Sequence, residues 1–377
     1  MPQLQVRAQA QRHEYEIRIG SGVLAEVGPV ARGCLGDRAR RLVIISNARI
    51  FSLYGRAVVK SLKANGFGVW HWLIGDGERH KSIQTVEQAL RFFSKTGLER
   101  GDGVVALGGG VVGDVAGLAA AVYLRGVPFI QIPTSLLAQI DSSVGGKTGV
   151  NLPGGKNLVG SFHQPAAVVA DIETLRTLPA RELVAGWCEC VKQGAVSSRK
   201  LFKATTDFLG ETRAREDLIS PRLEQLIASN CAFKASIVAA DEREDPGRTD
   251  HRSRRILNFG HTIAHALETV TSYRRFRHGE AVGQGMLVAG QISKNLGLLE
   301  QTELELLNRA VSLCGPLPST RDLDERAVVN AIAQDKKRTA GHVQWVLLER
   351  IGRPRIVDGK EISTTLLRQS LREVFRK

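Results

Sequence analysis

The stretch from Gly101 to Lys156 constrains the fold of this chain most, because it joins a buried strand, a glycine turn and a helix. Residues 101–107 combine a glycine turn with a short apolar run, which is typical of a buried parallel strand. Residues 108–114 (GGGVVGD) fit the spacing G-x-G-x-x-G, and the small residues of 115–123 predict a helix. Such a turn directs backbone N–H groups and a helix N-terminus at a pyrophosphate. The segment therefore indicates a dinucleotide site, although a purely structural turn would have the same spacing.

Two features distinguish this segment from the usual dinucleotide fingerprint. It lies far from the N-terminus, and no acidic residue occurs between Asp114 and Asp141 to bind a ribose. After a second strand at 127–132, the polar segments 141–148 and 154–157 are rich in glycine, hydroxyl groups and lysine. These segments are predicted to be loops that form a cradle for a phosphate or a carboxylate.

Strands and helices alternate over the first half of the chain, and helices dominate the second half. Strands are predicted at 15–19, 41–45, 68–73 and 167–170, with helices at 51–64 and 82–96. From Pro179 onward the hydrophobic period is helical, with helices predicted at 201–210, 221–240, 261–273, 278–296, 303–314 and 325–336. The predicted fold is an α/β dinucleotide-binding domain over residues 1–178 and an all-α domain over 179–377, with the active cleft between them.

Composition narrows the class of partner. The 377 residues include 52 lysines and arginines against 38 acidic residues, a formal net charge of +14. The basic residues are scattered and few aromatic residues lie among them, so no nucleic-acid partner is expected. A basic surface that attracts a small anionic substrate fits this distribution better. The sequence has no signal-peptide pattern and no apolar run long enough to cross a membrane, which predicts a cytoplasmic protein without a membrane partner.

The cysteines do not indicate a metal site. There are five, an odd number without paired spacing, which suits a reducing compartment. Cys188 and Cys190 could be taken for a metal pair, but residues two apart on a helix point to different faces. We therefore interpret them as small packing residues.

Histidines gather in one region of the helical half. They lie in the segments 258–265 (NFGHTIAH) and 278–280 (HGE). His261 and His265 have the i, i+4 spacing of a zinc-binding pair on one helix face. Spacing alone would select these two as metal ligands.

The motifs GGGVVGD, YLRG, PTSLLAQIDSSVGGKT and GKN, in this order and spacing, resemble the 3-dehydroquinate synthase family. The resemblance runs from about Tyr15 to about Arg353. It implies conversion of a phosphorylated sugar acid, 3-deoxy-D-arabino-heptulosonate 7-phosphate, into 3-dehydroquinate and phosphate in aromatic amino acid biosynthesis. In this family NAD⁺ transiently oxidises the substrate, phosphate leaves by β-elimination, the ketone is reduced again and an aldol step closes the ring. The resemblance also implies a homodimer.

The metal site implied by the resemblance differs from the one that the histidine spacing selects. The family's ligands for zinc or cobalt match Glu189, His261 and His278, which leaves His265 for the substrate as a candidate proton relay. Cys188 stands where the family usually has alanine, and a residue of this size should not change the site. Three protein ligands leave coordination positions open, which is typical of a catalytic metal.

For the cofactor, the resemblance supplies the acidic partner that the glycine turn lacks. The segment 76–81 (DGERHK) is similar to the family's adenosine-binding D-G-E-x-x-K motif, with Glu78 and Lys81 as candidates for the ribose end. Asn47 follows the strand 41–45, at the edge where ligands bind in open α/β sheets, although a role as a turn former is equally open. The implied NAD contacts are Asn47, Asp76, Gly77, Glu78, Arg79, His80, Lys81, Gly109, Gly110, Val111, Val112, Gly113, Asp114, Thr134, Ser135, Lys147, Lys156, Thr174, Leu175, Arg176 and Thr177.

The implied substrate contacts are cations, amides and a carboxylate, as a crowded anion requires. Lys147 and Lys192 are expected near the sugar oxygens, and Lys156, Asn157 and Arg254 near the phosphate. The segment 245–255 is several residues longer than the usual link in the family, so Arg252 or Arg255 could replace Arg254. The implied set is Arg125, Asp141, Lys147, Lys156, Asn157, Lys192, Lys234, Arg254, Asn258, His265, His278 and one of the pair Lys336 and Lys337, with Lys337 as the choice.

Other functions remain open from the sequence. A related sugar-phosphate cyclase would keep the fold and the metal but change the carboxylate and phosphate contacts, and the presence of Lys234, Arg254 and Asn258 argues against it. An NAD-dependent polyol dehydrogenase of similar architecture would instead form NADH in net amounts. A non-enzymatic basic binding protein is a more distant alternative.

Overall fold

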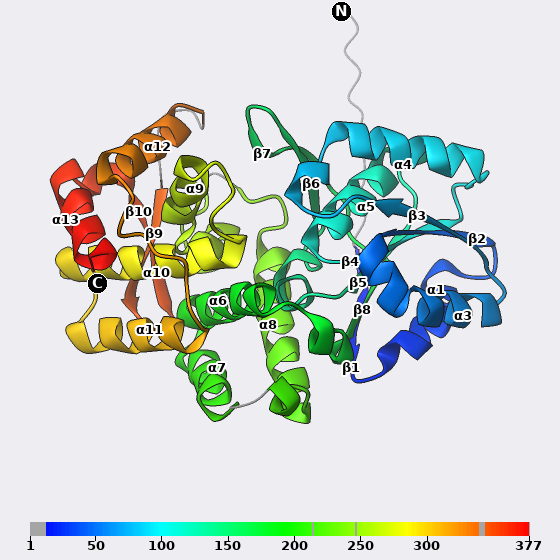
Figure 1. Cartoon of the computed structure of the whole chain (residues 1–377), viewed down its shortest axis with the longest axis horizontal. Helices are drawn as coiled ribbons and strands as arrows, with labels where there is room; N and C mark the ends of the chain where they lie inside the picture. The colour runs from blue at the N-terminus through cyan, green and yellow to red at the C-terminus, as the bar shows by residue number, and fades with distance from the viewer. Residues whose placement is uncertain (1–12, 213–214, 246, 339–343, 377) are drawn as a thin grey trace, which may run out of the picture.

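The chain folds into two halves that lie side by side (Figure 1). A computed structural model describes residues 13–212, 215–245, 247–338 and 344–376. The first half carries a parallel sheet with helices on both faces, and the second half consists mainly of helices. This arrangement confirms the predicted fold class. Within the described residues, no helix is both long enough and apolar enough to span a membrane.

The sheet of the first half consists of β1 (Glu16–Gly20), β2 (Arg41–Asn47), β3 (Gly68–Ile74), β4 (Gly103–Gly108), β5 (Phe129–Pro133) and β8 (Ala167–Asp171). These six strands are parallel and lie in the order β1-β8-β5-β4-β2-β3. All residues of β4, β5 and β8 are buried, as expected of a parallel sheet covered on both faces. The connections reverse direction between β2 and β4, and the crevice at such a switch point is where open α/β sheets bind ligands.

Helices cover both faces of the sheet because its strands point apolar side chains alternately to each face. Along β2, Leu42 and Ile44 belong to one apolar layer and Val43 and Ile45 to the other. The first layer packs on α1 (Val27–Leu35) and α3 (Arg56–Ala64), and the second on α4 (Ile83–Lys95) and α5 (Gly110–Val122).

Two helices of the first half depart from their predicted form. The helix predicted at 51–64 is preceded by α2 (Ala48–Ile50), begins with a π-helical turn, η2 (Phe51–Gly55), and continues as α3. The helix predicted from residue 115 starts at Gly110, because the glycine turn winds directly into α5 and Gly113 N–H already donates to Gly109 O at 3.0 Å.

The two polar segments predicted as loops end in strands that were not predicted: residues 147–148 and 155–157 are strand, whereas residues 141–146 are not. β6 (Lys147–Leu152) and β7 (Gly155–Phe162) pair as an antiparallel hairpin on the side of the first half that faces the second (Figure 1). Glycine permits this close pairing, since a Cβ on Gly160 would lie 2.3 Å from the Thr148 carbonyl oxygen. Val150 and Val159 pack toward α5, whereas the other face of the hairpin is polar or exposed. The polar face concealed the strands in the sequence.

The second half consists of α6 (Ala180–Ser197), α7 (Arg199–Glu211), α8 (Pro221–Ala240), α9 (His261–Val270), α10 (His278–Asn295), α11 (Gln301–Leu313), α12 (Glu325–Arg338) and α13 (Thr364–Phe375). One antiparallel hairpin, β9 (Gln344–Arg350) and β10 (Arg353–Asp358), was not predicted. It is attached to α10, where Ser293 Oγ accepts from Leu348 N–H at 3.1 Å. Short helices connect the elements: η1 (Val23–Glu26), η3 (Glu78–His80), η4 (Tyr123–Arg125), η5 (Ala138–Ser142), η6 (Ile172–Thr177), η7 (Arg215–Leu218), η8 (Arg254–Asn258) and η9 (Gly359–Glu361).

The two halves share one apolar core at their junction. Leu136, Ile140 and Leu175 of the first half belong to the same buried cluster as Val191 of α6 and Ile227 of α8. Burial of this apolar surface fixes α6 and α8 against the carboxyl edge of the sheet. The domain boundary predicted at residue 178 falls just before α6, and it remains a prediction.

Candidate active site

The glycine turn lies at the carboxyl end of β4, beside the switch point between β2 and β4. Gly109 precedes α5, so the N–H groups of residues 110–112 lie in its first turn, where backbone donors lack intrahelical partners. The surroundings are tight: a Cβ on Gly109 would lie 3.4 Å from the Ser135 hydroxyl, and one on Gly110 would lie 3.2 Å from the Ser142 hydroxyl. The turn therefore combines backbone donors, nearby hydroxyl groups and little side-chain bulk, a chemistry that fits a phosphate.

Lys81, the residue predicted for the ribose end, contacts Asp114 and Asn157. Its side chain is buried, its Nζ lies 2.5 Å from Asp114 Oδ2, and it donates to Asn157 Oδ1 at 2.5 Å. Burial raises the pKa of Asp114 in spite of the nearby Lys81 ammonium. Lys81 thus connects α5 to β7, and its ammonium is turned to these partners.

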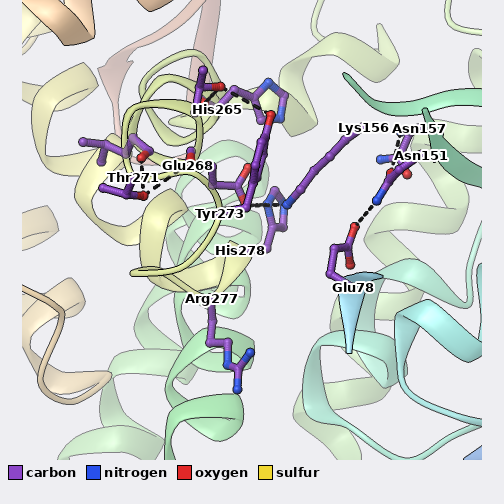
Figure 2. Close-up of polar contacts among 12 residues, drawn as sticks. Glu78, Asn151, Lys156, Asn157, His265, Glu268, Thr271, Tyr273, Arg277 and His278 are labelled. Carbon is purple, nitrogen blue, oxygen red and sulfur yellow. Dashed lines mark hydrogen bonds and ion pairs between the residues drawn. The ribbon is translucent and has the colours of Figure 1, made fainter. Parts of the chain in front are cut away.

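Exposed carboxylates flank the turn at the same edge of the sheet. Glu78 Oε1 accepts from Asn151 Nδ2 at 2.8 Å (Figure 2), and Asp76 Oδ1 accepts from Asn47 Nδ2 at 3.2 Å. Asn47 also caps α2, because its Oδ1 accepts from Ile50 N–H at 2.8 Å. Its role as a local cap is therefore visible, and it occupies the ligand-binding edge as well. In the same segment, Gly77 and Arg79 are exposed and His80 is partly exposed.

The remaining implied NAD contacts follow β5 and β8. Thr134 is buried and its N–H donates to Gly108 O at 3.0 Å, and Ser135 adjoins Gly109. The side chains of Thr174 and Leu175 are fully enclosed, with exposures of 1% and 0%. Arg176 pairs with Glu173, and Thr177 contacts the Tyr54 hydroxyl at 2.5 Å. The side chains of Thr174 and Leu175 are thus enclosed in the interior, and the cofactor contact implied for this segment stays a prediction.

The three implied metal ligands come together from three helices of the second half. Glu189 lies in α6, and His261 and His278 are the first residues of α9 and α10. Their potential ligand atoms all lie within 4.8 Å of one another. His265 is a neighbour on α9, with its ring centroid 5.6 Å from that of His261 and 6.3 Å from that of His278. The structure thus gathers the set implied by the resemblance and places His265 beside it.

Hydrogen-bond partners orient both imidazoles of this trio. His261 Nδ1 lies 3.3 Å from Phe259 O, and His278 Nδ1 lies 3.3 Å from Glu268 Oε1. An Nδ1–H that donates to such an acceptor leaves Nε2 with a lone pair, and His278 Nε2 faces Glu189 Oε1 at 3.7 Å. Burial and the nearby Lys192 ammonium lower the pKa of His261 well below its ordinary value. His261 is therefore neutral, as a metal ligand must be.

Two lysines implied for the substrate are buried beside the trio. Lys192 Nζ lies 2.5 Å from Glu189 Oε2, and Lys234 Nζ lies 2.9 Å from Asp141 Oδ1. Burial opposes ionisation of Asp141, but Lys234 and Lys192 outweigh it and lower the pKa of the carboxyl. Burial also opposes the Lys192 ammonium, yet Glu189 and Asp141 raise its pKa, whereas burial prevails at Lys234 and lowers the pKa there. These four residues form a compact group of alternating charges.

Glu244, which the sequence analysis did not single out, joins two predicted residues. Lys147 of β6 contacts its Oε2, and Asn258 Nδ2 donates to its Oε1 at 3.3 Å. Glu244 has a φ of 56°, a left-handed conformation that is uncommon for a residue other than glycine. An acidic residue after a helix gives no sequence pattern, so only the fold identifies it.

Of the three arginines considered for the phosphate, Arg254 is the one directed at the predicted cradle. It is 2% exposed, and it donates from Nη2 to Gly145 O at 3.0 Å and from Nη1 to Glu242 O at 2.8 Å. Arg255 contacts Gln344 of β9 instead, and Arg252 is exposed. This geometry favours the choice of Arg254.

Lys156 of β7 crosses from the first half to the second (Figure 2). Its Nζ lies 3.1 Å from Glu268 Oε1 and 4.6 Å from the centre of the Tyr273 ring. Burial opposes ionisation of Glu268, but His278 and Lys156 lower its pKa to about 2. The sequence analysis also missed Tyr273, which lies in a turn, and Glu268, because an acidic residue in a helix has the pattern of a solvated charge.

One implied substrate contact is not brought to this group, and another lies outside the described side chains. Arg125 is exposed in η4, at the end of α5 opposite the glycine turn. Thirteen helical residues span about 20 Å, so the prediction for Arg125 is not met within one chain. Lys336 and Lys337 lie at the end of α12, outside the residues whose side chains the structure describes.

Comparison with known sequences decides the family. Two family models match in succession, 3-dehydroquinate synthase N-terminal over residues 71–185 and 3-dehydroquinate synthase C-terminal over residues 186–338. The chain is 40% identical over 364 residues to the 3-dehydroquinate synthase of Nostoc sp. (strain PCC 7120), and the match covers 96% of each chain. The chain belongs to the 3-dehydroquinate synthase family. The predicted family and the predicted enzymatic activity are confirmed.

Solved structures related to this 3-dehydroquinate synthase family member share its architecture over nearly the whole chain. A 2-epi-5-epi-valiolone synthase from Streptomyces hygroscopicus with NAD⁺ and Zn²⁺ bound is 26% identical, with a TM-score of 0.86 and coverage of 98% of this chain and 99% of that one. A 2-deoxy-scyllo-inosose synthase complexed with carbaglucose-6-phosphate, NAD⁺ and Co²⁺ is also 26% identical, with a TM-score of 0.81 and coverage of 96% and 97%.

The residues of the trio fit a divalent metal in this 3-dehydroquinate synthase family member. Glu189 Oε1 is buried without a hydrogen-bond partner among the described residues, and Glu189 Oε2 lies 2.5 Å from the Lys192 ammonium. Burial opposes the charging of His278, but Glu268 and Glu189 raise its pKa, so a metal would compete with a proton for this ring. A buried carboxylate with one unpartnered oxygen, next to two oriented imidazoles, is the donor set of a zinc- or cobalt-type site.

Proposed function

We propose that the enzyme converts 3-deoxy-D-arabino-heptulosonate 7-phosphate into 3-dehydroquinate and phosphate at the junction of its two halves, with NAD and a zinc or cobalt ion as cofactors. The observation that carries this proposal is the convergence of Glu189, His261 and His278 with lysines from both halves. Membership of the family supports the substrate. The two related structures that hold NAD⁺ with Zn²⁺ or Co²⁺ support the cofactors.

NAD binds at the carboxyl edge between β2 and β4. The backbone donors of residues 110–112 bind its pyrophosphate, with the hydroxyl groups of Ser135 and Ser142 beside them. The carboxylates of Asp76 and Glu78 take the ribose hydroxyl groups, because they are exposed at this edge and Lys81 is not.

Glu189, His261 and His278 would hold the metal. When bound, NAD supplies a transient hydride acceptor and the metal a Lewis acid for the oxygen that is oxidised and reduced again. Lys192, held as an ammonium by Glu189 and Asp141, donates hydrogen bonds to the sugar oxygens. His265 lies beside the trio, and its ring moves protons between substrate oxygens and the solvent.

The phosphate of the substrate binds where the cations of the two halves meet. Arg254 offers a guanidinium next to Gly145, and Lys156 reaches in from β7. Asn258, Lys147 and Asn157 complete the polar surroundings. Fixed cations lower the energy of the phosphate as it leaves, because they need no reorganisation at the moment of elimination.

The enzyme is also proposed to be a cytoplasmic homodimer with two domains, residues 1–178 and 179–377, as the family resemblance implies. Arg125 is exposed on the first half, away from its own site, so its implied substrate role requires a contact that one chain does not make.

One incubation tests the function. The full-length enzyme is given the heptulosonate phosphate and NAD⁺ in an amount far below the substrate, and phosphate and NADH are followed together. Phosphate is expected to accumulate without NADH, because the hydride returns to the product, and a chelator is expected to stop its release. NADH formed mole for mole with product would instead identify a polyol dehydrogenase, and phosphate release that survives complete metal removal would contradict the proposed site.

A further inference from the structure

One carboxylate oxygen connects the two halves of the site. Glu268 Oε1 lies 3.3 Å from His278 Nδ1 and 3.1 Å from Lys156 Nζ, so α9 bridges a proposed metal ligand of α10 and a lysine of the β6–β7 hairpin (Figure 2). The Glu268 side chain is 2% exposed. A buried carboxylate with two cationic or donating partners is held firmly, since losing either partner would leave charge poorly compensated.

The contact to His278 has a direct consequence for metal binding. A carboxylate that accepts from Nδ1 fixes both the ring orientation and the tautomer, and it makes Nε2 more basic. His278 Nε2 then points to Glu189 Oε1, 3.7 Å away. Without Glu268, the ring of His278 could rotate or place its proton on Nε2, and both changes would weaken the site.

The contact to Lys156 is reinforced by a turn of unusual backbone. Ser272 and Tyr273 have φ values of 51° and 58°, left-handed conformations that are unfavourable for L-amino acids. Tyr273 N–H donates to Glu268 O at 2.7 Å, which holds the turn against α9. The turn sets the Tyr273 ring under Lys156 Nζ at 4.6 Å, a cation–π contact. The Lys156 ammonium therefore contacts both the Glu268 carboxylate and the Tyr273 ring.

We propose that Glu268 is a positioning residue with two simultaneous tasks: it orients His278 for the metal and, with Tyr273, holds Lys156 of the opposite half at the site. The inference rests on the proposed role of His278 as a ligand. It assigns Glu268 no contact with the substrate. A residue that serves only the packing of α9 would leave the metal affinity and the environment of Lys156 unchanged.

The first measurement is the affinity of the metal-free full-length protein for Co²⁺, by competition with a chelator. Glu268→Gln keeps the volume and an acceptor oxygen but removes the charge, and Glu268→Leu removes both. Loss of such an outer-shell carboxylate typically costs about 10- to 100-fold in metal affinity, so we expect weaker binding in the order wild type, Gln, Leu. Glu303→Gln is the matched control, because Glu303 is an ion-paired carboxylate of the same half that contacts Arg199 outside the site.

The same measurement in a Lys156→Ala background separates direct orientation from an indirect effect. If Glu268 acts on His278 itself, Glu268→Gln lowers Co²⁺ affinity by a similar factor in this background. A loss that disappears without Lys156 would overturn the first task. Wild-type affinity in folded Glu268→Gln and Glu268→Leu would overturn it as well.

The second measurement is the rate at which an amine-reactive reagent labels Lys156, followed by mass spectrometry in the metal-free protein. We expect faster labelling of Lys156 in Glu268→Gln, with exposed Lys60 unchanged as an internal reference. An unchanged rate for Lys156 would overturn the second task. Failure of the proposed metal site gives a different result, because then His278→Ala would bind Co²⁺ as tightly as the wild type.

Discussion

We expect substrate binding to depend on Asp241, because its carboxylate holds the long segment 242–253 in place. Its carboxylate is 6% exposed at the end of α8. Oδ1 accepts from Asp245 N–H at 2.8 Å and Oδ2 from Arg254 N–H at 2.8 Å, so one side chain closes both ends of the segment. Replacement by asparagine keeps one acceptor but turns an amide NH₂ toward the other backbone N–H.

The size of the effect follows from that mismatch. A lost hydrogen bond to a charged group together with an unsatisfied buried donor costs about 2 kcal/mol. If this free energy entirely destabilises the loop conformation that positions Arg254, the KM for the heptulosonate phosphate rises by up to about 30-fold, because 1.4 kcal/mol corresponds to a factor of ten. Metal content should not change, because neither Asp241 nor its partners belong to the trio. Steady-state kinetics and metal analysis of Asp241→Asn measure both quantities.

The pH dependence of this effect has a definite sign. Burial opposes ionisation of Asp241, but hydrogen bonds from the backbone of Asp245 and Arg254 lower its pKa below the ordinary value. A lowered pKa stabilises the fold above the unfolded value of about 3.9, and this contribution is lost as the pH falls through the folded pKa. The difference in unfolding midpoint between wild type and Asp241→Asn should therefore shrink below about pH 4. Asp245→Asn, an exposed carboxylate of the same segment, serves as the control. A KM within twofold of wild type, with an unchanged midpoint at neutral pH, would refute this reasoning.

Two further predictions concern the assignment of individual residues. Bound metal should fall strongly in each of the ligand variants Glu189→Gln, His261→Ala and His278→Ala. It should be retained in His265→Ala and in the double change of Cys188 and Cys190 to alanine. If metal analysis finds loss in His265→Ala and retention in His278→Ala, the pair chosen by helix spacing is correct. Arg254→Lys should raise the KM for the phosphorylated substrate, because lysine cannot form the bidentate contact of a guanidinium. Arg255→Ala should leave this KM nearly unchanged. Equal effects of the two variants in steady-state kinetics would reject the choice of Arg254.

Sequence patterns predicted the helices of the second half well, because those helices have clear ends. α8 begins at Pro221 and ends at Ala240, as predicted, with proline at its first turn. In the first half, Ser82 caps α4 by accepting from Thr85 N–H, which matches the predicted start of that helix. The hairpin β6–β7 escaped prediction because only Val150 and Val159 mark its buried face, and pairing between glycine-rich strands depends on partners distant in sequence.

The candidate site was predictable where a motif fixes the chemistry and unpredictable where the fold supplies the partner. The resemblance selected Glu189, His261 and His278, which no spacing rule would join, and the structure brings them together. Glu244 and Glu268 do not belong to any motif that the sequence analysis used. They join the site because lysines of β6 and β7 contact them. The same dependence on tertiary contacts explains Lys81, which sits in the expected segment but pairs with Asp114.

Each of four lysines implied for the substrate has a carboxylate partner, and the exposure of each pair determines how it should respond to salt. Lys192 and Lys234 keep 2% and 8% of their side-chain surface, whereas Lys147 and Lys156 keep 49% and 27%. Exposed charges are screened by ions at distances beyond about 8 Å at physiological ionic strength, and buried pairs much less. Lys147 should thus contribute a salt-sensitive part of substrate attraction, and the KM of the wild type should rise with salt more steeply than that of Lys147→Met. Lys234→Met should lose affinity without changing the steepness, because its charge is shielded by protein. Parallel salt dependences for wild type and Lys147→Met would show that the half-exposed lysines do not steer the anionic substrate, and the attraction would then belong to the surface charge as a whole.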